Sequence, residues 1–149
     1  MTKEFIDFYS QNIDKGSKPI NGVMEFLKWA KAKNISMAVC TNKQERLAVD
    51  LLKKLRMYEY FEYVAGSDTF PFNKPDPRHL TNVVEIIQGD IKKTIMIGDS
   101  EVDGKSAENA NIPFVLVKDG YTEKSSEEIK HDELIKDFKN FDKIIEKYL

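Results

Sequence analysis

Short, fully apolar segments alternate along this chain with stretches of helical periodicity. Four of these segments have the length of a strand, at residues 35–40, 63–66, 94–97 and 113–117. Strands that are apolar on both faces are typical of a parallel sheet covered by helices on both sides. The alternation therefore predicts an α/β fold built on a parallel sheet.

Apolar side chains spaced three and four residues apart predict the helices between these strands. Three sets of side chains show this spacing: Val23, Phe26, Leu27 and Ala30; Leu47, Leu51, Leu52 and Leu55; and Leu80, Val83, Val84 and Ile87. A further helix is predicted to begin near Val102. Similar spacing predicts a helix over residues 2–12 and one or two amphipathic helices over residues 125–149.

The length, net charge and cysteine content of the chain limit the class of protein to which it can belong. A chain of 149 residues has the size of one domain, and a formal charge of −2 gives no electrostatic argument for nucleic acid or an anionic membrane as a partner. A single cysteine, Cys40, excludes an intrachain disulfide and favours a reducing compartment. The start of the chain has no apolar signal core, and no apolar run reaches the ~20 residues of a membrane span. We expect a cytoplasmic protein.

A polar residue lies within two residues of the end of each of the four predicted strands. Thr41, Asp68, Asp99 and Asp119 occupy these positions. Parallel sheets bind ligands in the crevice beyond the carboxyl ends of their strands. These residues therefore mark the edge of the sheet at which we expect a functional site.

Thr41 and Asn42 stand between the first buried strand and the next helix. A hydroxyl and an amide that lie beside the free N–H groups at the start of a helix form an anion site. The same two residue types also cap helices routinely, so a helix cap is the alternative interpretation.

Lys74 lies in the segment 73–77, where Pro75 and Pro77 flank Asp76. The prolines restrict the backbone and so hold the lysine in place. A lysine held over the carboxyl edge of a sheet balances the charge of a phosphate as a compact cation. The alternative is a proline-rich turn with a solvated lysine.

Asp99 follows Gly98 at the end of a buried strand, and Asp103 lies four residues further on. Carboxylate oxygens suit Mg²⁺, which binds proteins through one or two carboxylates and keeps several waters. The alternative assigns Asp99 or Ser100 to a helix cap and Asp103 to the first helical turn.

Taken together, the three segments resemble the last three signature motifs of haloacid dehalogenase-type hydrolases, and within them the phosphoglycolate phosphatase-like group. The resemblance runs from about Pro19 to Tyr121. It is carried by residues 18–23, 38–43, 65–69, 74–77, 96–100 and 120–121. It implies a Rossmann-like core and a Mg²⁺-dependent phosphatase acting on a small phosphate monoester such as 2-phosphoglycolate.

The resemblance also implies roles for individual residues. Thr41, assisted by Asn42, would hydrogen-bond the phosphoryl oxygens, and Lys74 would neutralise charge in the transition state. Thr41 and Lys74 are thus the predicted catalytic residues. Asp99 would bind Mg²⁺, and Asp103 would bind or orient the ion through water.

The nucleophile motif of the family, Asp-x-Asp at the end of the first strand, is absent. The chain has twelve aspartates, and no two are separated by a single residue. The resemblance therefore divides the chain into a remnant of a helical cap, residues 1–18, and an incomplete phosphatase core, residues 19–149. We expect the phosphate-binding elements to persist without turnover by this chain, which behaves as a fragment.

In the family the missing strand lies between the strands that end at Thr41 and Asp99. Its loss leaves two buried strand edges with unpaired backbone groups, which is costly. We expect one of three outcomes: the two strands pair with each other, another copy of the chain fills the gap, or a missing N-terminal segment completes the sheet.

Two other functional classes remain as alternatives. One is a non-catalytic module that binds phosphate or metal. The other is a receiver-like signalling domain, which needs an early acidic pair that nothing before Cys40 supplies. A dinucleotide-binding protein is disfavoured because no Gly-x-Gly-x-x-Gly is present. We interpret His79 and His131 as surface residues and Cys40 as a core residue.

Overall fold

The structure is a computed structural model, and it describes residues 5–8, 22–117, 129–136 and 138–148. The strands are β1 (Phe5–Phe8), β2 (Ser36–Cys40), β3 (Tyr63–Ala65), β4 (Thr94–Gly98), β5 (Phe114–Val117) and β6 (Glu133–Ile135). The α-helices are α1 (Val23–Ala32), α2 (Glu45–Lys54), α3 (Pro77–Ile86), α4 (Glu101–Asn109) and α5 (Phe141–Ile145). Short 3-10 helices lie at Tyr58–Tyr60, Ile91–Lys93 and Glu146–Tyr148.

The described strands form one parallel sheet in the order β3-β2-β1-β4-β5-β6. Every residue of β2, β4 and β5 is buried, as expected for strands covered on both faces. The prediction of an α/β fold with a parallel sheet is therefore confirmed.

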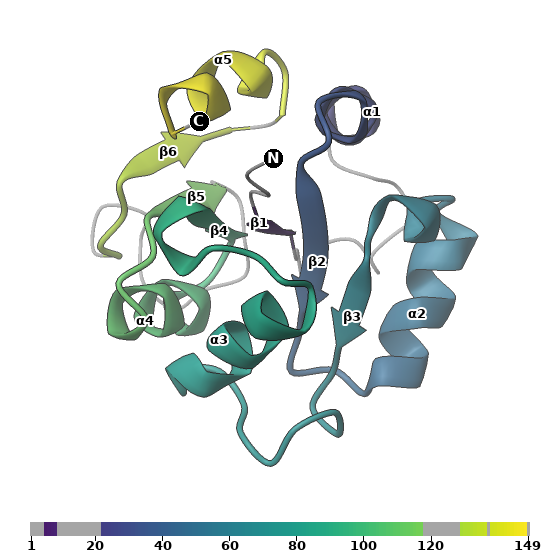
Figure 1. The fold of residues 1–149 in the computed structure, drawn as a ribbon, viewed down its shortest axis with the longest axis vertical. Coiled ribbons are helices and arrows are strands. Elements are labelled where there is room, and N and C mark those ends of the chain that lie inside the picture. Colours follow the sequence, from purple (N-terminus) through teal and green to yellow (C-terminus); the bar gives the residue numbers. More distant parts are fainter. Residues whose placement is uncertain (1–4, 9–21, 118–128, 137, 149) are drawn as a thin grey trace.

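Two layers of helices cover the sheet, and each has its own apolar core. On one face α1, α2 and α5 pack over strand residues that include Met37, Val39 and Ile97. On the other face α3 and α4 pack over the alternate residues, such as Ala38 and Met96. Figure 1 shows α3 and α4 side by side, in agreement with the contact between them. The alternation of strand side chains between the two cores gives a three-layer, doubly wound arrangement.

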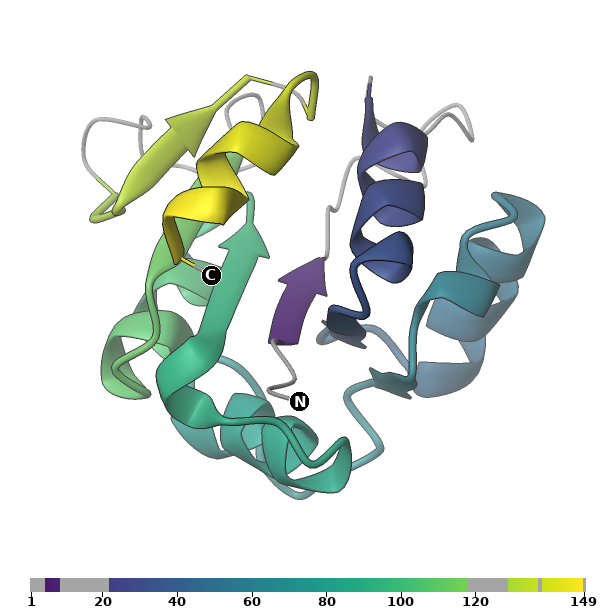
Figure 2. The same ribbon diagram turned by 45° about the horizontal axis from the view of Figure 1, so that its top comes forward.

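The centre of the sheet differs from the prediction. Residues 5–8, predicted as part of a helix, form β1, and β1 pairs with both β2 and β4 (Figure 2). The position expected to lack a strand is thus filled by the N-terminal segment of the same chain. None of the three expected outcomes is needed, because β1 satisfies the backbone groups of the two edges that would otherwise be buried and unpaired.

The C-terminal segment also differs in part. Residues 133–135, predicted as helical, form the edge strand β6 beside β5. The amphipathic pattern does produce a helix further on, because Phe141 and Ile145 are buried on one face of α5. The other predicted strands and helices occur where the apolar patterns place them. No helix within the described ranges is long and apolar enough to cross a membrane.

Candidate functional site

The candidate site lies at the carboxyl edge of the sheet, on both sides of β1. Thr41 follows β2, Asp99 follows β4, and both residues are buried. Since β1 separates the two strands, Thr41 and Asp99 are two strand spacings apart, about 10 Å. The two polar groups thus lie on either side of the line of β1, beyond its last residue, Phe8.

Thr41 is held by its own backbone and by the loop that it begins. Its N–H donates to the Ala65 carbonyl at 2.9 Å, and its Oγ1 accepts from the Lys43 N–H at 3.0 Å. It does not cap α2, because the N-cap of that helix is Gln44. A hydroxyl that accepts through its oxygen keeps its proton for donation. Thr41 is therefore placed as a hydrogen-bond donor at the sheet edge.

Asn42 ties this edge to the loop that carries Lys74. The Asn42 Nδ2 donates to the Lys74 carbonyl at 3.0 Å, and the Lys74 N–H donates to the Asn42 Oδ1 at 3.2 Å. The Lys74–Pro75 peptide bond is cis. This reciprocal pair fixes the backbone of Lys74 beside the end of β2, although 32 residues separate the two in sequence.

Lys74 is buried rather than solvated, with 5% of its surface exposed. Its Nζ lies 2.5 Å from the Asp103 Oδ1. The other carboxylate oxygen of Asp103 accepts from the Asp99 N–H at 3.1 Å. A single carboxylate thus connects the lysine to the end of β4, which excludes the alternative of a lysine in solvent.

Gly98 allows Asp103 to approach the end of β4. A Cβ at position 98 would lie 2.5 Å from the Asp103 Oδ2, closer than atoms pack. The cap proposed for this segment is also present, since the Ser100 Oγ accepts from the Asp103 N–H at 3.3 Å. Capping by Ser100 and pairing of Asp103 with Lys74 therefore coexist, and the cap helps to orient the carboxylate.

Asp99 and Asp103 are the residues at this edge that could hold a metal ion. The described ranges contain no group of three or more His, Cys, Asp or Glu side chains suited to a metal. Mg²⁺ needs only one or two carboxylates, because waters and substrate phosphate complete its shell. Both oxygens of Asp103 already accept bonds from Lys74 and Asp99, so this carboxylate suits orientation of the ion. Carboxylate oxygens at this edge are of the chemical kind that Mg²⁺ takes as ligands.

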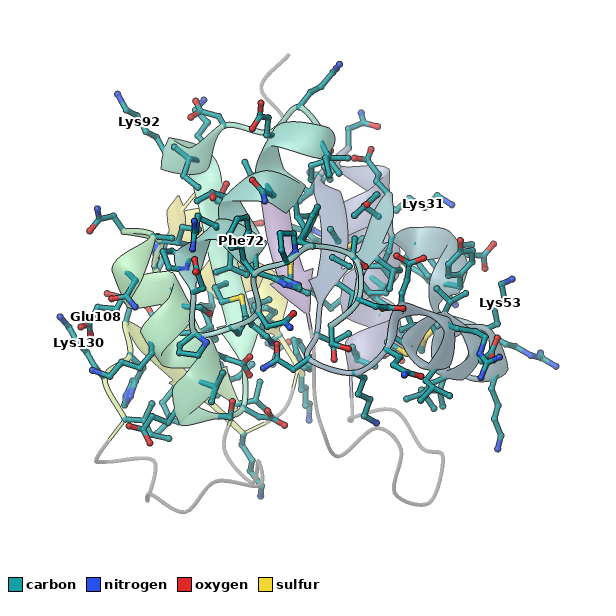
Figure 3. All side chains as sticks on the ribbon, turned by 90° about the horizontal axis from the view of Figure 1, so that it is seen from below. Lys31, Lys53, Phe72, Lys92, Glu108 and Lys130 are labelled. Carbon is teal, nitrogen blue, oxygen red and sulfur yellow. The ribbon has the colours of Figure 1, made fainter. Side chains whose placement is uncertain are left out.

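A rim formed by one exposed and two partly exposed side chains lies on the segment that carries Lys74 and on the start of α3. The Arg78 guanidinium lies 3.6 Å from the centre of the Phe72 ring and pairs with the Asp76 carboxylate at 2.7 Å. The Arg78 hydrogen bonds lower the pKa of Asp76 to about 2. Figure 3 shows Phe72 near the middle of this face, whereas the labelled lysines lie at its periphery. Sequence reasoning did not predict this rim.

His79 is fully buried, so its interpretation as a surface residue was wrong. Its Nδ1 lies 2.9 Å from the Phe72 carbonyl oxygen, and its ring packs edge-on against Phe70. Because a carbonyl only accepts, Nδ1 carries the proton. Burial lowers the pKa of His79. His79 therefore anchors, from α3, the loop that leads to Lys74.

Asp68, which the sequence marked only as a residue at the functional edge, and Thr69 hold the β2 side of the site. Asp68 accepts from the Glu45 N–H at the start of α2, and Thr69 donates to the Glu45 carboxylate. The sequence signal is a cluster of glycine and short polar residues directly after a buried strand. Asp119, Gly120 and Tyr121 lie outside the described residues.

A family model described as haloacid dehalogenase-like hydrolase matches residues 1–117. The chain is also 38% identical over 138 residues to a phosphoglycolate phosphatase of Mesorhizobium japonicum, covering 93% of this chain and 61% of that protein. It is 41% identical over 136 residues to a phosphoglycolate phosphatase of Agrobacterium fabrum, covering 91% of this chain and 58% of that protein. The chain thus spans about three fifths of the length of these curated relatives.

A crystal structure described as a predicted phosphoglycolate phosphatase of Haemophilus somnus has a similar fold. The TM-score is 0.81 at 26% identity, and the match covers 85% of this chain and 57% of that one.

Proposed function

This chain belongs to the haloacid dehalogenase-like hydrolase family, and we propose that it forms the phosphate- and magnesium-binding part of a phosphatase for small phosphate monoesters such as 2-phosphoglycolate. The names of the curated relatives support the choice of substrate. This chain spans only about three fifths of those relatives, so the phosphatase activity of a whole protein is itself part of the proposal.

The observation that carries the proposal is the buried position of Lys74 between the two halves of the edge. Its backbone is paired with Asn42 beside Thr41, and its ammonium is paired with Asp103 beside Asp99. A lysine, two carboxylates and a threonine hydroxyl are costly to bring together in a buried edge. A site for a phosphate and a divalent cation accounts for this cost.

Each residue has a distinct role in the proposed site. Thr41 donates its hydroxyl proton to a phosphoryl oxygen, and Lys74 neutralises the charge that develops on the phosphoryl group. Asp99 would hold the metal, with Asp103 orienting it. When bound, Mg²⁺ supplies positive charge that shields the phosphate from the two carboxylates.

The register of β1 supports a second candidate, binding of phosphate and metal without turnover. Asp7, the only aspartate of β1, pairs with Ala38 and Met96. Thr41 and Asp99 lie three residues beyond these partners, so the backbone of Asp7 is about 10 Å short of the edge. Among the described residues, β1 therefore brings no carboxylate nucleophile to the site.

A nucleophile would then have to come from residues other than those of β1. We propose that a preceding segment of a longer protein, or a second copy of this chain, supplies it. A supplied strand would compete with β1 for the position between β2 and β4. Activity that rises with the square of the protein concentration would support a second copy, whereas activity only after addition of an Asp-x-Asp peptide would support a preceding segment.

Titration calorimetry with inorganic phosphate, with and without Mg²⁺, tests the proposed binding. We expect phosphate binding that Mg²⁺ strengthens and that Thr41→Val weakens about tenfold, since a hydrogen bond to a charged group is lost. Thr94→Val is the matched control. Thr94 is also a buried threonine, but its hydroxyl bonds the Asp90 carbonyl at the start of β4.

Absence of phosphate binding by the unmodified chain would overturn the proposal. Equal weakening by Thr41→Val and Thr94→Val would also overturn it. Release of phosphate from 2-phosphoglycolate is the companion assay, and we expect none from this chain alone. Hydrolysis that Thr41→Val abolishes would instead establish a complete enzyme and exclude the second candidate.

A further inference from the structure

The hydrogen bonds between β2 and β3 continue beyond the ends of both strands. The Thr41 N–H donates to the Ala65 carbonyl at 2.9 Å, and the Ser67 N–H donates to the Lys43 carbonyl at 2.7 Å. The next alternate residue, Glu45, donates its N–H to the Asp68 Oδ1 at 2.9 Å. The end of β3 and the segment that follows it thus hold residues 41, 43 and 45 in succession. The first two are held by backbone groups and the third by the Asp68 side chain.

The Asp68 carboxylate therefore caps α2 from a different loop. The N-cap of α2 is Gln44, whose side chain makes no capping bond. The first N–H groups of a helix need an acceptor, and a carboxylate there also interacts favourably with the helix dipole. Asp68, 23 residues further along the chain than Glu45, supplies both the acceptor and the negative charge.

Thr69 fixes Asp68 and its neighbours against the same helix. The Thr69 Oγ1 accepts from the Gly66 N–H at 2.7 Å and donates to the Glu45 Oε1 at 2.7 Å. The two loops are in backbone contact here, since a Cβ on Gly66 would lie 2.2 Å from the Glu45 nitrogen. Only glycine permits this approach, and it leaves the loops little freedom to move relative to each other.

We propose that Asp68 and Thr69 are positioning residues for phosphate binding. By holding Glu45 at the start of α2, they keep the loop 41–43 in the geometry in which Thr41 faces the site; this inference rests on the proposed function. Neither residue touches the substrate. Their removal acts through the loop 41–43, whereas the Lys74 ammonium keeps a partner of its own, Asp103, on the β4 side.

The test compares phosphate affinity in Asp68→Ala and Asp68→Asn, measured by calorimetry far below the unfolding temperature. We expect Asp68→Ala to weaken phosphate binding by up to about tenfold, the effect of losing the Thr41 hydrogen bond to the phosphate. Asp68→Asn keeps an acceptor oxygen and so restores most of the affinity. Thr69→Val and Thr69→Ser form a second pair with the same expectation, and they carry the test if Asp68→Ala does not fold.

Asp90→Ala is the matched control. Asp90 is an exposed aspartate that accepts the Lys92 N–H at the start of a short helix, at the opposite edge of the sheet. A merely structural role for Asp68 predicts that both alanine variants lower the melting temperature and that neither changes phosphate affinity.

Unchanged affinity in Asp68→Ala, with binding by the unmodified chain, would overturn this inference and leave the proposed function standing. Equal losses of phosphate affinity in Asp68→Ala and Asp68→Asn would overturn the role of Asp68 as a hydrogen-bond acceptor. No binding by the unmodified chain would overturn the proposed function itself.

Discussion

The two sides of the candidate site are held by different kinds of interaction. On the β2 side, the loop after Thr41 is fixed by several hydrogen bonds from partly exposed groups, including the side chains of Asp68 and Thr69. On the β4 side, a buried pair, Lys74 and Asp103, holds the edge. The loss of one exposed hydrogen bond lowers the free energy of unfolding little, whereas breaking a buried ion pair lowers it strongly, because the partner left behind keeps an uncompensated charge.

Removal of the Lys74 ammonium should give the largest effect. In Lys74→Met the Asp103 carboxylate loses its ionic partner while it remains buried, and we expect a loss of about 3–5 kcal/mol in the free energy of unfolding. Urea denaturation at pH 7.5 measures this loss. The double variant Lys74→Met, Asp103→Asn removes the buried charge as well, so it should be more stable than Lys74→Met alone.

The exposed pair Arg78 and Asp76 is the control for the buried one. It has a comparable distance, 2.7 Å, but its arginine is 59% exposed. Exposed ion pairs contribute little to stability. We therefore expect Arg78→Ala to leave the urea midpoint unchanged within error. A loss equal to that of Lys74→Met would show that burial does not distinguish the two pairs.

Gly98→Ala should have the next largest effect, because it breaks the close approach within the β4 side without removing a charge. The new methyl would overlap the Asp103 side chain, so either the carboxylate or the end of β4 must move. Overpacking of this kind costs about 1–3 kcal/mol. Thermal and urea unfolding measure the cost, and phosphate affinity should fall with it, because Lys74 loses its orientation.

Gly104→Ala provides the comparison for Gly98→Ala. Gly104 lies in α4, and its Cβ would meet the Phe114 ring at 3.2 Å, a side chain that can shift slightly. Alanine also favours a helix more than glycine does. We expect a change below about 1 kcal/mol. A larger loss in Gly104→Ala than in Gly98→Ala would contradict the assignment of strain to the Asp103 contact.

The fold was predictable where burial alone determines the pattern of apolar residues along the sequence. Continuous apolar runs, such as Ile95 to Ile97, mark strands buried on both faces. β1 was not predictable in this way, because Phe5, Ile6 and Phe8 fit helical spacing as well as a strand. Its position between two other strands is a tertiary effect that overrides local spacing. β6 was missed because three residues are too few to show a period.

The candidate site was predictable to a different extent on its two sides. Lys74, Asp99 and Asp103 stand in short segments whose order along the chain resembles the motifs of the family, although their contacts appear only in the fold. Asp68 and Thr69 contact Glu45, more than twenty residues away, and the glycine and short polar residues around them predict a turn but not that partner. The burial of His79 likewise depends on the packing of α3.

The smallest expected effect on stability comes from His79, which anchors the loop that joins the two sides. It appears as a dependence of stability on pH. Burial, aided by the charge of Lys74, lowers the pKa of His79, while the Phe72 carbonyl and the Asp76 carboxylate oppose the shift. The folded state therefore resists protonation of a histidine that the unfolded state accepts below its usual pKa of about 6.5. The stability contributed by neutral His79 is present above that pH and is lost as the pH falls below it.

We expect the unfolding free energy of the chain to fall between pH 6.5 and 5.5, by at most about 1.4 kcal/mol per pH unit for this one proton. His79→Gln should lower stability at pH 7.5 but reduce its pH dependence. His131→Gln is the control, because His131 is only partly buried and lies far along the chain, beside β6. If His131→Gln flattens the pH profile and His79→Gln does not, the acid sensitivity belongs to the β6 edge and not to the Lys74 loop.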